Sequence, residues 1–129
     1  MRVLSVRDFG GIKDTLLDPN CQGISPVYQV YNELNDPKWT NRTEIYAGRL
    51  GTEFSKTFGH YHNVPNPETY RVVSGTGVLL LQKKHIENGV VVPETVDEVL
   101  LIRAVSGDEV IIMPEWGHNW ANVNKETLV

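Results

Sequence analysis

The sequence contains little cysteine, no excess of basic charge and no long apolar run. Cys21 is the one cysteine among 129 residues, so no disulfide can form within the chain. Without a signal peptide or a membrane-spanning run, we expect the chain in the cytoplasm. Twelve basic residues against sixteen acidic ones give a net charge of −4, and no basic cluster is present to attract nucleic acid or a membrane. A small molecule is the expected partner.

Helical periodicity is also scarce. Short runs rich in Val, Ile, Leu and Tyr predict β-strands instead, at residues 27–31, 44–50, 69–73, 78–82, 90–92, 99–105 and 110–113. Turn signals separate these runs, and Asn88-Gly89 is the strongest hairpin signal among them. We therefore predict a single all-β domain over residues 1–129, with the strands arranged as a sandwich or barrel. Residues 1–25 give no clear prediction.

Two histidines and a glutamate stand close together around a proline-rich turn. His60 and His62 are two residues apart, so on an extended backbone their side chains point the same way. The stretch after His62 contains two prolines and two asparagines, which favour a chain reversal that brings Glu68 back beside the histidines. Tyr70, two residues further on, is expected on the same face as Glu68.

His118 is a fourth candidate, because it follows a predicted strand and a proline. A single histidine near a strand is more often a surface residue or a hydrogen-bonded core residue than a ligand. Three histidines and one carboxylate together favour a metal site instead. His85, which precedes Asn88-Gly89, is expected to be a solvated hairpin residue.

These residues resemble the two sequence motifs of the cupin superfamily. The first motif contains His60-x-His62, Glu68 and Gly75, and the second runs from Gly107 through Pro114 to His118 and Asn122. Within that superfamily, the flanking residues 51–62 are most similar to the cupin-type glucose-6-phosphate isomerases of archaea and some bacteria. The resemblance implies a cupin double-stranded β-helix, which is a jelly-roll-like antiparallel barrel with a metal ion inside.

The resemblance also implies roles for individual residues. The metal ligands would be His60, His62, Glu68 and His118, and the residues that contact the sugar phosphate would be Thr43, Thr57, Gly59 and Tyr70. Strict alternation would point Thr57 away from the face of His60, so this assignment requires a bend near Phe58-Gly59. Family members form homodimers and continue past the position of Val129. We therefore expect that the chain lacks their C-terminal segment, and that another subunit or further residues close its pocket.

The implied reaction is the interconversion of glucose 6-phosphate and fructose 6-phosphate. A six-coordinate ion such as Fe(II) or Mn(II) is favoured over zinc, because four protein ligands would fill zinc's usual tetrahedron. Glu68 is the candidate catalytic base for a cis-enediol route, and a direct hydride shift is the other route. Two other functions stay open: another metal-dependent cupin enzyme such as a dioxygenase, and a non-catalytic sugar-phosphate-binding module.

Overall fold

The computed structural model describes residues 1–32, 34–61 and 65–129, and it confirms the all-β prediction. No helix in these ranges is long and apolar enough to span a membrane. A short helix α1 (Phe9–Ile12) and a 3₁₀ turn (Lys13–Thr15) follow the first strand. The strands are β1 (Arg2–Arg7), β2 (Tyr28–Asn32), β3 (Arg42–Ile45), β4 (Arg49–Leu50), β5 (Glu53–Lys56), β6 (Glu68–Arg71), β7 (Thr76–Glu87), β8 (Val90–Val105), β9 (Glu109–Ile112) and β10 (Trp116–Asn122).

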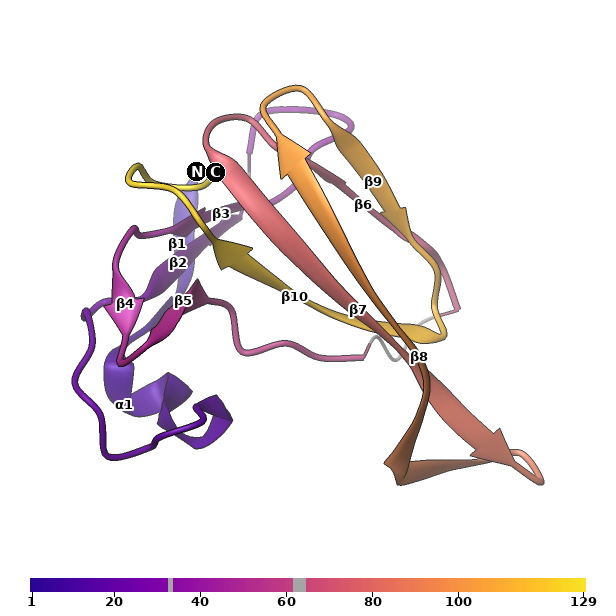
Figure 1. The fold of residues 1–129 in the computed structure, drawn as a ribbon. Helices are drawn as coiled ribbons and strands as arrows, with labels where there is room; N and C mark the ends of the chain where they lie inside the picture. The colour runs from indigo at the N-terminus through magenta and orange to yellow at the C-terminus, as the bar shows by residue number, and fades with distance from the viewer. Residues whose placement is uncertain (33, 62–64) are drawn as a thin grey trace.

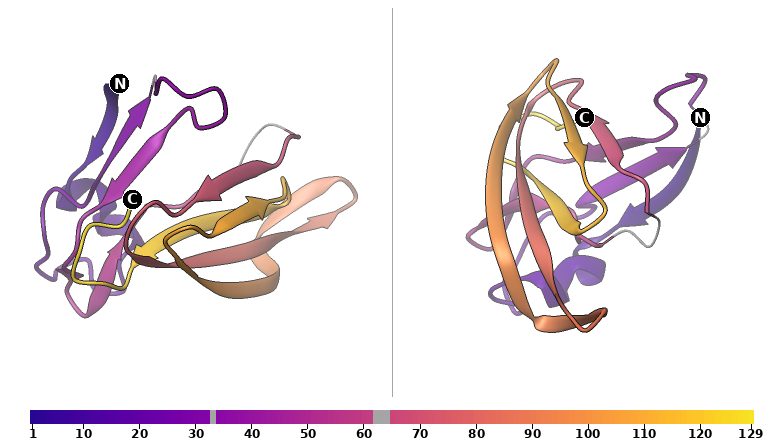
Figure 2. Two further views of the ribbon diagram at one scale, coloured as in Figure 1. Left: turned by 90° about the horizontal axis from the view of Figure 1, so that it is seen from above. Right: turned by 90° about the vertical axis from the view of Figure 1, so that its right-hand side faces the viewer.

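The strands form three antiparallel sheets. Their orders are β1-β2-β3, β4-β5-β10-β7-β8 and β6-β9. Figure 1 shows the long β7–β8 hairpin running beside β10, with β6 and β9 next to its upper end. Seen from above in Figure 2, the three-stranded sheet lies on one side of the molecule and β7, β8 and β10 lie on the other. One cavity is lined by residues from all three sheets.

Side chains from the three sheets and from the segment around α1 share one apolar core. Every second residue of β7 is buried from Gly77 to Leu81, as expected for a strand with one face toward the core. Burying a large aliphatic or aromatic side chain stabilises the fold by about 1.5–3 kcal/mol. The buried core residues are Ile12, Leu16, Val27, Tyr28, Ile45, Leu50, Val72, Leu79, Leu81, Ala104, Ile112, Trp120 and Leu128.

The predicted strand at residues 44–50 is wrong as a single element. β3 ends at Ile45, and β4 begins only at Arg49. Between them Gly48 has a φ of 142°, a conformation that L side chains rarely adopt. The chain therefore turns at this glycine, and β4 joins the five-stranded sheet while β3 stays in the three-stranded one.

Other strand predictions are confirmed with changed boundaries. The predicted strands at residues 90–92 and 99–105 are one continuous strand, β8, which pairs with β7 on both sides of register shifts between Val92 and Glu98. The turn between β7 and β8 uses Asn88 and Gly89 with φ of 51° and 76°, as the hairpin signal predicted. Strands β1, β5 and β10 were not predicted.

The last residues of the chain connect the sheets. Ile45 and Leu128 form an isolated antiparallel bridge, in which each backbone N–H donates to the other residue's carbonyl, at 2.8 and 2.9 Å. The buried side chain of Asn122 donates from Nδ2 to the carbonyls of Ile45 and Glu126, at 2.8 and 2.7 Å. Strand β10 is thereby linked to β3 and to the C-terminal residues.

Candidate functional site

Backbone pairing places His60 beside His118. His60 follows Gly59 outside any strand, whereas His118 lies in the middle of β10. The two residues form an isolated antiparallel bridge, with His60 N donating to His118 O at 3.2 Å and His118 N donating to His60 O at 3.1 Å. Residues opposite each other in an antiparallel pair point to the same side, and the ring centroids are 4.9 Å apart.

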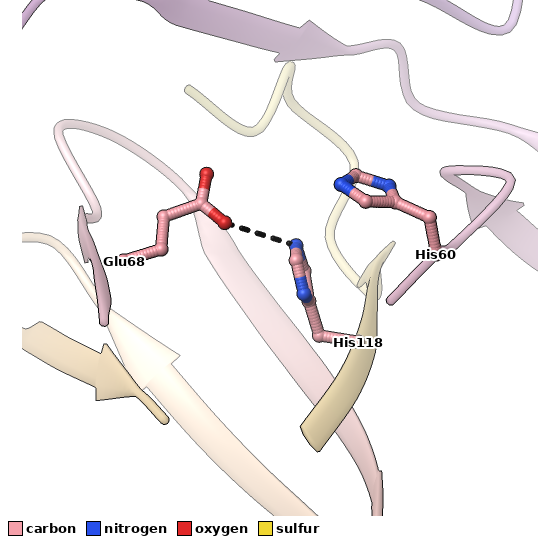
Figure 3. Close-up of side chains that lie close together, drawn as sticks. All are labelled: His60, Glu68 and His118. Atoms are coloured by element: carbon pink, nitrogen blue, oxygen red, sulfur yellow. Dashed lines mark ion pairs between the residues drawn. The ribbon is translucent and has the colours of Figure 1, made fainter. Parts of the chain in front are cut away.

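Glu68 begins β6 and points toward both rings (Figure 3). Its Oε2 atom lies 3.8 Å from His118 Nε2, and one ligand atom from each of His60, Glu68 and His118 lies within 4.8 Å of the others. The prediction that Glu68 returns to the histidines is therefore confirmed for His60. His62, the fourth predicted ligand, lies outside the described residues and stays a prediction.

The three residues fit a divalent transition-metal ion. Two imidazoles and a carboxylate form a mixed nitrogen and oxygen donor set, which suits Fe(II), Mn(II) and Zn(II). His118 is buried, Glu68 is half-buried and His60 is exposed. The cluster is therefore buried on the side of His118 and open to solvent on the side of His60. Oxygen atoms of a small molecule can approach it from the open side.

Tyr70 stands next to this cluster. Its hydroxyl lies 3.1 Å from His118 Nε2, and the two ring centroids are 5.4 Å apart. Burial raises the pKa of the Tyr70 phenol far above its usual value, and the neighbouring Glu68 carboxylate raises it further. Tyr70 therefore keeps its proton at physiological pH and remains a hydrogen-bond donor. The alternation predicted for β6 is confirmed, since Glu68 and Tyr70 are half-buried while Thr69 and Arg71 are exposed.

The bend required near Phe58-Gly59 is present. Gly59 has a φ of 87°, and a Cβ atom there would lie 3.1 Å from Asn119 Cβ and 3.2 Å from His118 O. A glycine thus permits both the turn and the close approach to β10. Before the bend, Thr57 N donates to Trp120 O at 2.9 Å, and Thr57 Oγ1 accepts from Trp120 N at 3.0 Å. The hydroxyl proton of Thr57 is left to donate elsewhere.

One open cavity of about 1030 Å³ contains these groups. Its size is that of a typical small-molecule site. Of the residues predicted to bind metal or substrate, the structure brings seven to the wall of this cavity: Thr43, Thr57, Gly59, His60, Glu68, Tyr70 and His118. Thr43 reaches it from β3, the others from the segment before β6, from β6 itself and from β10.

Basic and aromatic residues of the cavity wall were not predicted. The structure adds Arg7, Lys38, Trp39, Arg42 and Arg71. They belong to β1, to the β2–β3 connection, to β3 and to β6, which are brought together only by the folded chain. No sequence motif identifies these residues. The net charge of the chain is slightly negative, so it gives no indication that cations are grouped at one place in the fold.

Comparison with known proteins identifies relatives of this arrangement. The family model described as glucose-6-phosphate isomerase matches residues 26–129. The glucose-6-phosphate isomerase of Thermococcus litoralis is 29% identical over 97% of this chain and 66% of its own length. The one of Pyrococcus furiosus is 30% identical over 80% of this chain and 51% of its own length. The chain thus spans about half to two thirds of these two curated relatives.

A solved structure independently supports the fold. The Drosophila melanogaster CENP-C cupin domain superposes with a TM-score of 0.51, covering 85% of this chain and 71% of that domain. Its sequence identity to this chain is 12%, so the similarity concerns the fold alone. The predicted cupin architecture is confirmed.

Proposed function

This chain belongs to the glucose-6-phosphate isomerase family, and we propose that it interconverts glucose 6-phosphate and fructose 6-phosphate. The observation that carries this proposal is one cavity that contains both a His–Glu–His cluster able to hold a metal ion and the predicted phosphate contacts. The reaction moves one hydrogen between C2 and C1 of the sugar and shifts the carbonyl group in the opposite direction. The site must therefore stabilise the negative charge that develops on oxygen. It must also provide for the transfer of hydrogen between C2 and C1.

The metal ligands in this proposal are His60, Glu68 and His118, with His62 as the fourth. When bound, an Fe(II) or Mn(II) ion would act as a Lewis acid toward the oxygens at C1 and C2. Glu68 is the carboxylate of the cluster, and its Oε2 atom already lies 3.8 Å from His118 Nε2. The reacting end of the sugar, C1 and C2, would lie against His60, Glu68 and His118.

Glu68 is also the proposed catalytic base. In the cis-enediol route its carboxylate takes the proton from C2 and returns it to C1, while a hydroxyl proton passes from O2 to O1, so that the carbonyl moves from C1 to C2. In the alternative route a hydride moves directly from C2 to C1, the same hydroxyl proton passes from O2 to O1, and Glu68 serves only as a ligand. Tyr70 stays protonated, but its one hydroxyl proton is hydrogen-bonded within the cluster, where Glu68 is a partner, so a contact with a sugar or phosphate oxygen would require this proton to turn toward the substrate.

The other end of the sugar would lie against Thr43, Thr57 and Gly59. The Thr57 oxygen accepts the Trp120 N–H, which fixes the hydroxyl and leaves its proton for a phosphate oxygen. The bend at Gly59 lets the backbone approach an oxyanion without an intervening side chain. Both the hydroxyl and the backbone suit a phosphorylated sugar better than an apolar substrate.

A coupled isomerase assay on the metal-reconstituted chain tests the proposal. We expect fructose 6-phosphate to be formed, activity to be lost on chelation, and activity to return with Fe(II) or Mn(II). His118→Ala should abolish activity, whereas His85→Ala, which changes a histidine outside the cavity wall, should leave it unchanged. Oxygen consumption without isomerisation would indicate a dioxygenase instead. Ligand binding without any turnover would indicate a binding module.

The assembly and location of the protein belong to the same proposal. Its place would be the cytoplasm, where glucose 6-phosphate enters glycolysis and leaves gluconeogenesis. Its partner would be a second copy of the chain, as the family resemblance implies. The outer edge of β8 in the five-stranded sheet offers a surface for that pairing.

A further inference from the structure

Four basic side chains line the cavity, and three of them have an acidic neighbour. Lys38 Nζ lies 3.4 Å from Glu109 Oε1, and Arg42 Nη2 lies 2.6 Å from Glu44 Oε1. Arg71 lies over the Trp39 ring and acts electrostatically on Asp36, whose pKa is lowered chiefly by the backbone N–H groups of Trp39 and Lys38. Arg7 differs from these three, because it forms no ion pair with any residue that the structure describes.

The Arg7 side chain is held in place by uncharged groups. Its Nε donates to the Tyr28 hydroxyl at 3.3 Å, and one Nη donates to the Gly11 carbonyl at 3.4 Å. The guanidinium carbon lies 5.1 Å from the centroid of the Phe58 ring. Two of its five N–H donors are used in these bonds, so the others remain available among the described residues. The charge of Arg7 is positioned but not neutralised within that part of the chain.

The contacts of Arg7 place it at the proposed phosphate site. Phe58, which the guanidinium covers, lies between Thr57 and Gly59, and the Phe58 backbone N–H donates to the same Tyr28 hydroxyl at 3.3 Å. The proposed phosphate contacts of Thr43, Thr57, Gly59 and Tyr70 include no cation. A phosphate monoester carries a charge of about −1.5 to −2 at neutral pH, and a guanidinium binds such a group through charge-assisted hydrogen bonds.

We propose that Arg7 binds the phosphate group of the substrate and makes this site select phosphorylated over neutral sugars. The inference rests on the proposed function for the identity of the sugar. The proposal adds a substrate contact from β1. Arg7 lies before residues 26–129, the part of the chain that the family model matches. Arg7 would act as a specificity-determining residue at the far end of the substrate, away from the hydrogen transfer.

Kinetics on three variants test this role. Arg7→Gln should raise KM for glucose 6-phosphate by about 10- to 100-fold, the range expected for a lost charge-assisted contact, while kcat stays within about threefold. Arg7→Lys keeps the positive charge, so its KM for glucose 6-phosphate should rise less than that of Arg7→Gln. Arg49 is a matched control, since its guanidinium lies 4.1 Å from the Phe54 ring but outside the cavity wall. Arg49→Gln should leave KM unchanged. Equal KM values for Arg7→Gln and Arg49→Gln would overturn the proposal.

A second measurement does not depend on turnover. Inorganic phosphate titrated into the wild-type chain should shift the backbone amide signals of Phe58 and Gly59, whereas chloride at equal ionic strength should not. The shifts should disappear in Arg7→Gln and persist in Arg49→Gln. Shifts that are absent from the wild type, or equal in Arg7→Gln, would overturn the role of Arg7 even if the chain isomerises sugars. Phosphate shifts that depend on Arg7 in a chain without isomerase activity would instead count against the proposed reaction alone.

Discussion

Glu68 is the residue for which both a metal-binding and a catalytic role are proposed. Glu68→Gln keeps the volume of the side chain but removes its charge and most of its basicity. If Glu68 is the base, turnover should fall by about 100-fold or more while metal content falls less, because positioned acid-base groups typically contribute factors of 10² to 10⁴. Steady-state kinetics with elemental analysis of the same samples separates the two effects. Equal loss of metal and turnover would indicate a ligand only.

Isotopic labelling distinguishes the two routes for the hydrogen. With glucose 6-phosphate deuterated at C2, proton abstraction by Glu68 should release label to the solvent, because a carboxylic acid exchanges its proton with water. A direct hydride shift should keep the label at C1 of the product. Mass spectrometry of the product formed early in the reaction gives the answer. Complete retention would remove Glu68 from the proposed role of base.

His85 provides a pH-dependent contribution away from the cavity. Its ring lies 3.1 Å from Glu87 and 2.8 Å from Asp97, and these hydrogen bonds, Glu87 first, raise the pKa of His85 above its usual 6.5. A raised folded-state pKa stabilises the fold below the unfolded-state pKa, and this contribution is lost as pH rises through the folded-state value. Subtracting the free energy of unfolding of His85→Gln from that of the wild type should therefore give a difference that shrinks from pH 5 to pH 9.

An NMR titration of the His85 ring checks the cause directly. Asp97→Asn and Glu87→Gln should each move the pKa of His85 down toward 6.5, because each removes a negative partner. His85 is half-buried, but its partners Glu87 and Asp97 are exposed to solvent, which keeps the effect on stability small. A wild-type His85 that titrates below 6.5 would contradict the hydrogen-bonded geometry of this hairpin.

The sequence predicts the position of individual residues where local backbone geometry determines it. Side-chain alternation placed Glu68 and Tyr70 on one face, and turn chemistry predicted the return of Glu68 toward His60. The cations of the cavity could not be found in this way. Arg7 and Arg71 are 64 positions apart and reach the same cavity from different sheets, so only long-range packing brings them there.

At the scale of elements, the missed strand β10 has a composition that disfavours strands. β10 contains a glycine and two asparagines, yet it pairs with both β5 and β7 in the interior of the sheet. Tertiary context thus overrides a weak local propensity. β8 was predicted in two pieces because Pro93 and several acidic residues interrupt its apolar pattern. An edge strand tolerates a proline, since one side of its backbone has no ladder to complete.

Asn122 connects three elements through one buried amide. Its Nδ2 donates to Ile45 O and Glu126 O, and its Oδ1 accepts from Asn124 N at 3.0 Å. Asn122→Ala should lower the free energy of unfolding by about 1–3 kcal/mol, because buried backbone carbonyls lose their donors. Asn124→Ala, which changes an exposed asparagine nearby, is the matched control. Denaturant unfolding measures both, and equal stability of the two variants would show that the amide of Asn122 contributes little.

At the scale of the whole molecule, the cavity depends on how the sheets meet. Its wall combines β1 and β3 from one sheet, β6 from another and β10 from a third, so no single sheet contains the site. This distribution explains why the sequence could predict the fold class and the proximity of His60, Glu68 and His118 but not the shape of the pocket. The bridges between Ile45 and Leu128 and between His60 and His118 fix the relative positions of these sheets.

The five-stranded sheet ends in an edge that favours self-association. β8 is the edge strand, and no other strand in the described part of the chain pairs with its outer side. Near the middle of this edge the exposed fractions are 59% for Val99, 46% for Leu100 and 69% for Leu101. Apolar side chains are thus exposed on both faces of the sheet beside unpaired backbone groups. A second strand would cover both features.

A second copy of β8 is a suitable partner for this edge. In an antiparallel pair of two β8 strands centred on Leu100, Val99 would lie opposite the second copy's Leu101, and Asp97 opposite the second copy's Arg103. The centre of such a pair is aliphatic and its ends carry opposite charges, which is a stabilising cross-strand pattern. We therefore predict that the chain is a dimer in solution and that Leu101→Lys shifts it toward the monomer, because it places like charges near the two-fold axis.

Sedimentation velocity over a range of protein concentrations measures this equilibrium. Leu17→Lys is the matched control, since Leu17 is 86% exposed but lies far in sequence from β8 and outside every strand. It should leave the dimer unchanged, while Leu101→Lys should raise the dissociation constant at least tenfold without lowering the thermal stability of the isolated monomer. A wild-type chain that stays monomeric at high concentration would refute self-association. A dimer that survives Leu101→Lys but is lost with Leu4→Lys would place the interface on β1, whose exposed Val3, Leu4 and Val6 form the competing apolar edge.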